Sequence, residues 1–159
     1  MSELIKKAID LAVEAHKGQK DSRGEEYIEH PFEVMRRMMR DKRPEIELAV
    51  AVMHDILEDT PRTEKDIYNA VSACCADKAL LVTEALKAIT KAKNEDYDEY
   101  LERLKGNVIA RMVKLYDLEH NIERNLKTFK EDKKSAQRLL KYIRAYDYLG
   151  GTNQPYTTS

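Results

Sequence analysis

Glycine and proline are scarce in this chain, with 5 and 4 copies among 159 residues. No segment keeps up the alternation of apolar and polar residues that marks a half-buried strand. Internal repeats, low-complexity tracts and linkers are lacking as well. These absences argue against a sheet architecture and against several domains. The apolar residues recur instead at helical spacing, as in the N-terminal stripe of Leu4, Ile5, Ala8, Ile9, Ala12 and Ala15.

Cysteine and long apolar runs are nearly absent too. Cys74 and Cys75 are the only cysteines, and two neighbouring residues form neither a good structural disulfide nor a C-x-x-C zinc or redox motif. No apolar run approaches the ~20 residues of a membrane span, and the first residues lack the apolar region of a signal peptide. We therefore expect a cytoplasmic protein without a membrane partner.

Neither sign of charge is in excess. Lys and Arg together number 28, Asp and Glu number 29, and the net charge is −1. This balance provides no global field that would attract nucleic acid or an anionic membrane, although 36% of the residues are charged. We expect no nucleic-acid partner, and a homo-oligomer is left open.

The chain does contain a succession of helix signals. Pro31 and Pro44 suit the first turn of a helix, where the missing N–H is harmless, and Thr63 can cap the helix that follows it. We expect an all-α domain over residues 1–149 and a flexible tail over residues 150–159. The domain should have seven or eight helices, over residues 2–17, 32–41, 44–58, 63–72, 77–91, 96–105, 107–126 and 131–149.

The stretch AVAVMHDILEDT, residues 49–60, joins an apolar helix to four ionisable side chains. These are His54, Asp55, Glu58 and Asp59. Burying an unpaired charge costs several kcal/mol in practice, so these groups either face water or are compensated. A metal ion is one means of compensation.

Two other segments offer partners for such an ion. His30 stands just before Pro31 at a helix start. Asp117 lies in a segment whose apolar residues predict burial, with His120 and Asn121 on the same side of the helix at i+3 and i+4. Imidazoles and carboxylates from three segments suit a borderline divalent ion with open coordination positions better than a closed thiolate zinc site.

Glu58 and Asp59 are placed differently. Each follows its partner, His54 or Asp55, by four residues and so lies one turn further along the same helix face. The pair can stand over a metal without ligating it, where a general base or proton shuttle acts.

Plainer interpretations apply to the other polar residues. His16 is expected on the surface at the end of a helix, and His120 fits a neighbour of a ligand as well as a hydrogen-bonded scaffold group. The tyrosines at helical spacings favour packing over base stacking: Tyr97, Tyr100, Tyr142, Tyr146 and Tyr148.

Three motifs occur in a suggestive order: AHKGQKDSRGEEYIEHPFEV, HDILEDT and VKLYDLEHNIERNL. Over about residues 4–149 the chain resembles the HD-type metal-dependent phosphohydrolases, specifically the hydrolase domain of RelA/SpoT-type alarmone enzymes. The small stand-alone HD proteins of that group look closer still, because KLYDLEHN resembles their motif.

The resemblance implies an all-helical HD domain that binds one divalent ion, commonly Mn²⁺, with Fe²⁺, Ni²⁺, Co²⁺, Zn²⁺ or Mg²⁺ as alternatives. It implies that Glu58 and Asp59 activate water and that Asn121 contacts the nucleotide. The implied reaction removes the 3′-pyrophosphate of guanosine tetra- or pentaphosphate. The implied metal ligands are His30, His54, Asp55 and Asp117.

Two positions depart from the pattern that the resemblance implies. Asp21 stands where those enzymes usually carry a cation, and Leu118 follows the metal aspartate where they have Arg or Lys. Both changes remove positive charge that a polyphosphate needs. The expected replacements in substrate binding are Lys20, Arg23 and Lys114, with Arg124.

The leading hypothesis is therefore a manganese-dependent phosphohydrolase acting on a nucleotide, with the alarmone as best guess. Its alternatives are a broader nucleotidase or phosphatase, a non-catalytic nucleotide-binding HD module and a purely structural helical protein. Pyrophosphate transfer to GTP is not expected, because the chain has no length for a synthetase domain.

Overall fold

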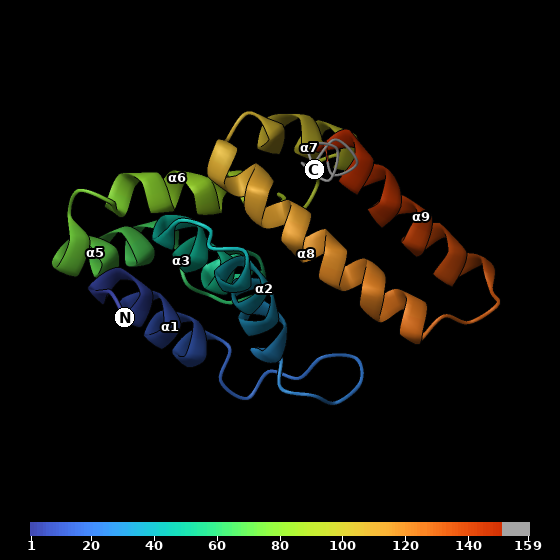
Figure 1. Ribbon diagram of the computed structural model, residues 1–159, viewed down its shortest axis with the longest axis horizontal. Coiled ribbons are helices and arrows are strands. Elements are labelled where there is room, and N and C mark those ends of the chain that lie inside the picture. Colours follow the sequence, from blue (N-terminus) through green and yellow to red (C-terminus); the bar gives the residue numbers. More distant parts are fainter. Residues whose placement is uncertain (151–159) are drawn as a thin grey trace.

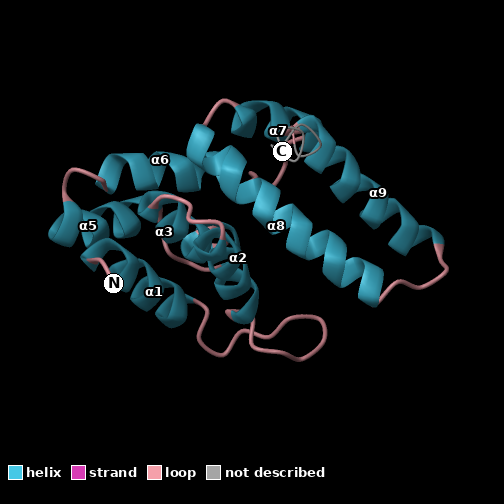
Figure 2. Ribbon diagram, viewed as in Figure 1, coloured by secondary structure: helices cyan, strands magenta, loops and turns pink. Residues whose placement is uncertain are grey.

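The computed structural model describes residues 1–150, and these are almost entirely helical (Figure 1). They contain no strand, and a single bridge joins Lys20 and Glu26 (Figure 2). The predicted all-α fold is confirmed. From residue 151 onward the expected tail lies outside the described part. The elements are α1 (Glu3–Ala15), α2 (Glu29–Arg40), α3 (Glu45–Met53), the single turn α4 (Ile56–Asp59), α5 (Glu64–Cys75), α6 (Ala79–Ile89), α7 (Tyr97–Lys105), α8 (Val108–Lys127) and α9 (Lys133–Tyr148).

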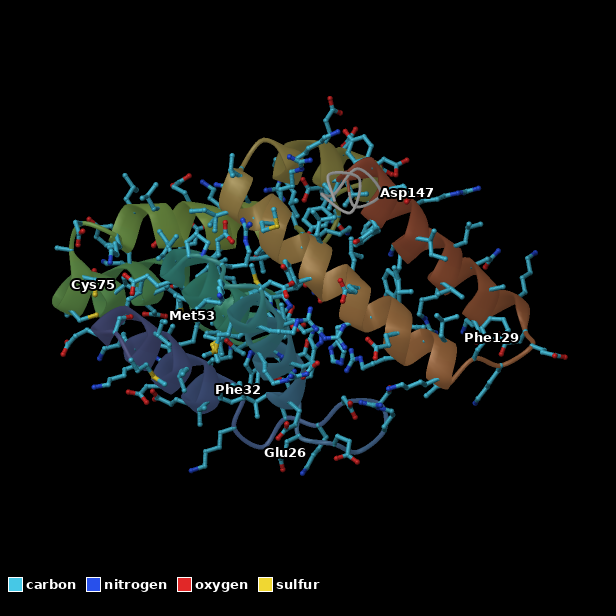
Figure 3. The ribbon with its side chains drawn as sticks, in the orientation of Figure 1. Glu26, Phe32, Met53, Cys75, Phe129 and Asp147 are labelled. Carbon is cyan, nitrogen blue, oxygen red and sulfur yellow. The ribbon has the colours of Figure 1, made fainter. Side chains whose placement is uncertain are left out.

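Helix α3 is the centre of the core. Each of its residues from Glu47 to Met53 is buried, and it packs against α1, α2, α6 and α8. Figure 3 shows Met53 in the interior, close to α1 and α2. An apolar run without a polar face is what a helix enclosed on every side requires. Glu47 is the charged exception, and Arg43 binds its carboxylate at 2.7 Å.

The regular helix is interrupted between α3 and α4, although His54 and Asp55 keep φ and ψ angles of the right-handed helical region. The sequence predicts one helix over residues 44–58, but α3 ends at Met53 and α4 begins at Ile56, so this prediction was wrong at His54 and Asp55. Adjacent side chains on a straight helix point about 100° apart. The break lets these two converge, with His54 Nε2 3.2 Å from Asp55 Oδ2.

Helices α2 and α8 are held together by Arg37, which is largely buried. Its guanidinium lies 3.1 Å from Glu119 and 2.5 Å from Glu123 on α8. This contact sets the first turn of α2, with His30, against the middle of α8, with Asp117. Helix α9 returns alongside α8 (Figure 1). No helix within residues 1–150 combines the length and hydrophobicity needed to cross a bilayer.

Candidate active site

Four predicted metal ligands converge where α2, the α3–α4 break and α8 meet. His30 Nε2 lies 2.8 Å from Asp117 Oδ1 and 3.8 Å from Asp55 Oδ2. His54 Nε2 lies 3.2 Å from Asp55 Oδ2 and 3.4 Å from Asp117 Oδ1. All four side chains are buried, and His30, His54 and Asp117 form a group able to hold a metal ion.

The ring orientations suit this role. His54 Nδ1 donates to the carbonyl of Ala51 at 2.7 Å, which leaves the lone pair on Nε2. That Nε2 is buried and has no hydrogen-bond partner among the described residues. His30 Nδ1 lies 2.8 Å from Nδ1 of His120, so a ligand role for His30 Nε2 requires Nδ1–H to donate to His120. Burial, followed by His30, lowers the pKa of His120 to about 4, so its ring is neutral and can accept.

The cluster attracts positive charge. Burial lowers the pKa of His54, but Asp55 and Asp117 outweigh burial and raise it to about 9. Burial raises the pKa of Asp117, but Lys114 and His54 hold it well below its usual range. Without an ion, a proton therefore occupies His54 near neutral pH. A divalent cation would take the place of that proton, so the residues fit a metal ion.

Glu58 and Asp59 stand beside this cluster as the two exposed residues of the turn α4. Burial and the nearby Asp55 raise the pKa of both carboxyl groups. Together with Asp55 they form a second group of carboxylates within reach of one ion. The structure thus places them next to the predicted ligands, and their role as acid–base groups stays a prediction.

Tyr27 is a site residue that sequence reasoning missed. Its hydroxyl lies 2.8 Å from Asp55 Oδ2 and 2.9 Å from Asp59 Oδ2. Burial, then Asp55 and Asp59, raise the pKa of Tyr27, so the phenol keeps its proton. The hydroxyl carries one proton, so it donates to either Asp55 or Asp59 at a given moment. Tyr27 thereby connects an expected metal ligand, Asp55, with an expected acid–base residue, Asp59. In the sequence, only its position three residues before His30 indicates that Tyr27 could lie near the site.

The site opens into a cleft of about 380 Å³. Three of the predicted substrate-binding residues lie there, namely Lys114, Asn121 and Arg124, and the first two hold Asp117. Lys114 Nζ lies 2.8 Å from Asp117 Oδ2, and Asn121 donates to Asp117 Oδ1 at 2.9 Å. Arg124 donates to Asn121 at 2.8 Å. The lining residues are Tyr27, His30, Asp55, Glu58, Asp59, Lys91, Tyr97, Tyr100, Lys114, Asp117, Asn121, Arg124, Lys141 and Tyr142.

The other two predicted substrate-binding residues do not line this cleft. Lys20 pairs with Glu26 on the loop before α2. Arg23 pairs with Asp21 at 3.2 Å and lines a neighbouring cavity of about 400 Å³. Asp21 Oδ1 also accepts the backbone N–H groups of Arg23 and Glu25. The carboxylate therefore shapes the loop, and its charge is compensated there.

Leu118, which stands where the related enzymes have Arg or Lys, is fully buried in the core. His16 was expected on the surface, yet only 2% of it is exposed. Its Nδ1 lies 2.8 Å from Gln19 Oε1, and its ring packs 5.0 Å from that of Tyr27.

Comparison with known proteins places these residues among relatives. No family model matches the chain. It is 30% identical over 134 residues to the bifunctional (p)ppGpp synthase/hydrolase SpoT of Escherichia coli (strain K12), covering 82% of this chain and 19% of that protein. It is 29% identical over 140 residues to a GTP pyrophosphokinase of Myxococcus xanthus, covering 84% of this chain and 18% of the relative. The chain thus spans about a fifth of the length of these relatives.

A solved structure shares the fold. It is that of a metazoan ortholog of SpoT, described as hydrolysing ppGpp and acting in starvation responses. The TM-score is 0.77 at 21% sequence identity, and the match covers 96% of this chain and 88% of the other. The likeness extends over the helices that carry the site.

Proposed function

The chain carries an HD-type helical domain related to that of RelA/SpoT proteins, and on this premise we propose that it is a metal-dependent phosphohydrolase acting on a nucleotide. The observation that supports this most is the buried cluster of imidazole and carboxylate groups beside an acidic pair. It lies at a cleft that also presents ammonium and guanidinium groups.

The metal would be held by His30, His54, Asp55 and Asp117, and we propose Mn²⁺ because the mixed nitrogen and oxygen set suits a borderline divalent ion. When bound, such an ion polarises a phosphoryl oxygen and lowers the pKa of a water molecule from about 16 toward neutrality.

The chain's own residues supply the proton transfer. The raised pKa of Glu58 and Asp59 brings both carboxyl groups closer to neutrality. We assign the proton of the attacking water to Glu58, because Asp59 already accepts a hydrogen bond from Tyr27. The hydroxyl of Tyr27 holds the Asp59 carboxylate in place. Lys114 and Asn121 fix the two oxygens of Asp117.

The substrate that we propose is guanosine 3′,5′-bis(diphosphate). Water would attack the phosphorus atom bound to the 3′-oxygen, and that P–O bond would break. The proton taken up by Glu58 would pass to the 3′-oxygen, so pyrophosphate and guanosine 5′-diphosphate would be released. Relatives named guanosine-3′,5′-bis(diphosphate) 3′-pyrophosphohydrolase support this choice. The test is a substrate panel with Mn²⁺ that compares the tetraphosphate with nucleoside mono- and triphosphates. A kcat/KM for the tetraphosphate no higher than for ordinary nucleotides would refute it.

A broader nucleotidase is the second candidate, and the loop before α2 favours it. Lys20 is paired with Glu26 and Arg23 with Asp21, so neither expected cation is free to hold a polyphosphate.

Asp21→Asn is expected to raise kcat/KM for the tetraphosphate a few-fold, the size of effect typical of an exposed ion pair. The amide oxygen still accepts both backbone N–H groups that Asp21 Oδ1 accepts. Removing the charge of Asp21 also removes its ion pairs with Arg23, 3.2 Å away, and with Arg124, 3.9 Å away. Both guanidinium groups then become available to phosphate.

Asp21→Arg serves as the contrast in the same assay. Arginine cannot accept those backbone N–H groups, so it should disturb the loop and bring no gain despite its positive charge. Equal gains from both variants would show that charge alone matters and that the loop hydrogen bonds do not.

A further inference from the structure

One wall of the active-site cleft has no role in the function proposed above. It comes from the segment after α6, the start of α7 and the middle of α9, and it presents Lys91, Tyr97, Lys141 and Tyr142. Tyr97 and Lys141 also line an adjoining cavity of about 590 Å³ between α7 and α9. Tyr97 and Lys141 therefore lie where the active-site cleft and this cavity meet.

The two lysines of this wall differ from the other cations near the site. No carboxylate in the described part of the chain lies within ion-pair distance of Lys91 or Lys141. Lys91 donates to the carbonyl of Ala92 at 3.2 Å, and Lys141 lies over the ring of Tyr97, 4.1 Å from its centre. Lys114, by contrast, is paired with Asp117. Among residues 1–150, neither lysine of this wall is held in an ion pair, and Glu58 acts on Lys141 only from a longer distance.

Tyr97 adds an unsatisfied polar group to the same wall. Its hydroxyl oxygen is buried, yet it has no hydrogen-bond partner among residues 1–150. A buried hydroxyl left without a partner costs roughly 1–3 kcal/mol. Tyr100, three residues on, donates instead to the carbonyl of Ile89. Tyr97 also lines the cleft, so an acceptor bound there would supply the missing hydrogen-bond partner.

The ammonium groups also act on one another. Burial, followed by Lys114 and Lys91, lowers the pKa of Lys141, so these charges repel each other. An anion between them would relieve this repulsion, and phosphate oxygens accept from both ammonium and hydroxyl donors.

We propose that Lys91, Lys141 and the Tyr97 hydroxyl form an anion subsite, which holds a phosphate group of the substrate other than the one at the metal cluster. This inference rests on the proposed function, because it assumes a substrate with phosphates at two places. It moves the phosphate-binding role from Lys20 and Arg23, on the loop before α2, to this wall of the cleft.

The test uses Lys91→Met, Lys141→Met, their double variant and Tyr97→Phe in the full-length, Mn²⁺-loaded protein. Methionine keeps an unbranched chain without the charge, and phenylalanine removes only the hydroxyl. Lys93→Met and Lys134→Met are the matched controls, because both lysines are exposed and neither lines the cleft. The double variant should raise KM for guanosine tetraphosphate about tenfold or more, with kcat within about twofold. A substrate with a single phosphate should keep its KM.

A binding measurement separates the subsite from the reaction. Calorimetric titration with inorganic pyrophosphate should show weaker binding in the double variant than in the controls. If neither this affinity nor KM changes, the subsite is refuted while the hydrolase function stands. If the wild type hydrolyses no nucleotide but binds pyrophosphate through these lysines, the proposed function fails and the subsite stands.

Discussion

His54→Ala is expected to lose the metal ion and the hydrolase activity together. His54 Nε2 faces Asp55 at 3.2 Å and Asp117 at 3.4 Å, and it has no hydrogen-bond partner in the described structure. Even partners that only orient a ligand change metal affinity by about 10- to 100-fold, so removing a ligand should cost at least about 100-fold. Alanine also removes the imidazole that contacts both Asp55 and Asp117. The two buried carboxylates then repel each other without compensation, which opposes folding.

The measurement is metal content by elemental analysis together with kcat, and the melting temperature reports on folding. His16→Ala is the matched control, because His16 is equally buried but lies outside the cluster. It should retain the ion. Full metal occupancy in His54→Ala would exclude this cluster as the metal site, whatever happened to the activity.

The helical framework could be predicted because its signals are local. The apolar run before His54 indicates a helix enclosed on all sides, and α3 is one. Thr63 forms the predicted cap of α5, accepting the N–H of Asp66. The break at His54 and Asp55 could not be predicted, since no glycine or proline marks it. His54 there contacts Asp117, 63 positions further along the chain, which local signals do not reveal.

Imidazole and carboxylate groups beside apolar runs need compensation, and this indicated a metal site. The particular ligand set came from the resemblance of the three motifs. The substrate side was harder, because the sequence does not show which cations are already paired. Lys20 forms an ion pair with Glu26, whereas Lys141 forms no ion pair within residues 1–150. Tyr27 could not be found either, because its two acceptors, Asp55 and Asp59, become neighbours only after folding.

Glu58→Gln is expected to lower kcat by about 10²- to 10³-fold, the contribution typical of a general base. Glutamine preserves the size of the side chain but cannot take up a proton. Metal content should stay nearly unchanged, because Glu58 is outside the buried group of His30, His54 and Asp117. Glu84→Gln, an exposed carboxylate on α6, is the control and should leave kcat and metal content alone.

The pH dependence gives this prediction a second readout. Burial and Asp55 raise the pKa of Glu58 above its usual value. A base works only when deprotonated, so wild-type kcat should fall as the pH drops through this raised pKa. Glutamine does not titrate, and the variant should lack that acid limb. Loss of the metal in Glu58→Gln and in Asp59→Asn would have another meaning. Both residues share a possible ion site with Asp55, so they would then be ligands rather than acid–base groups.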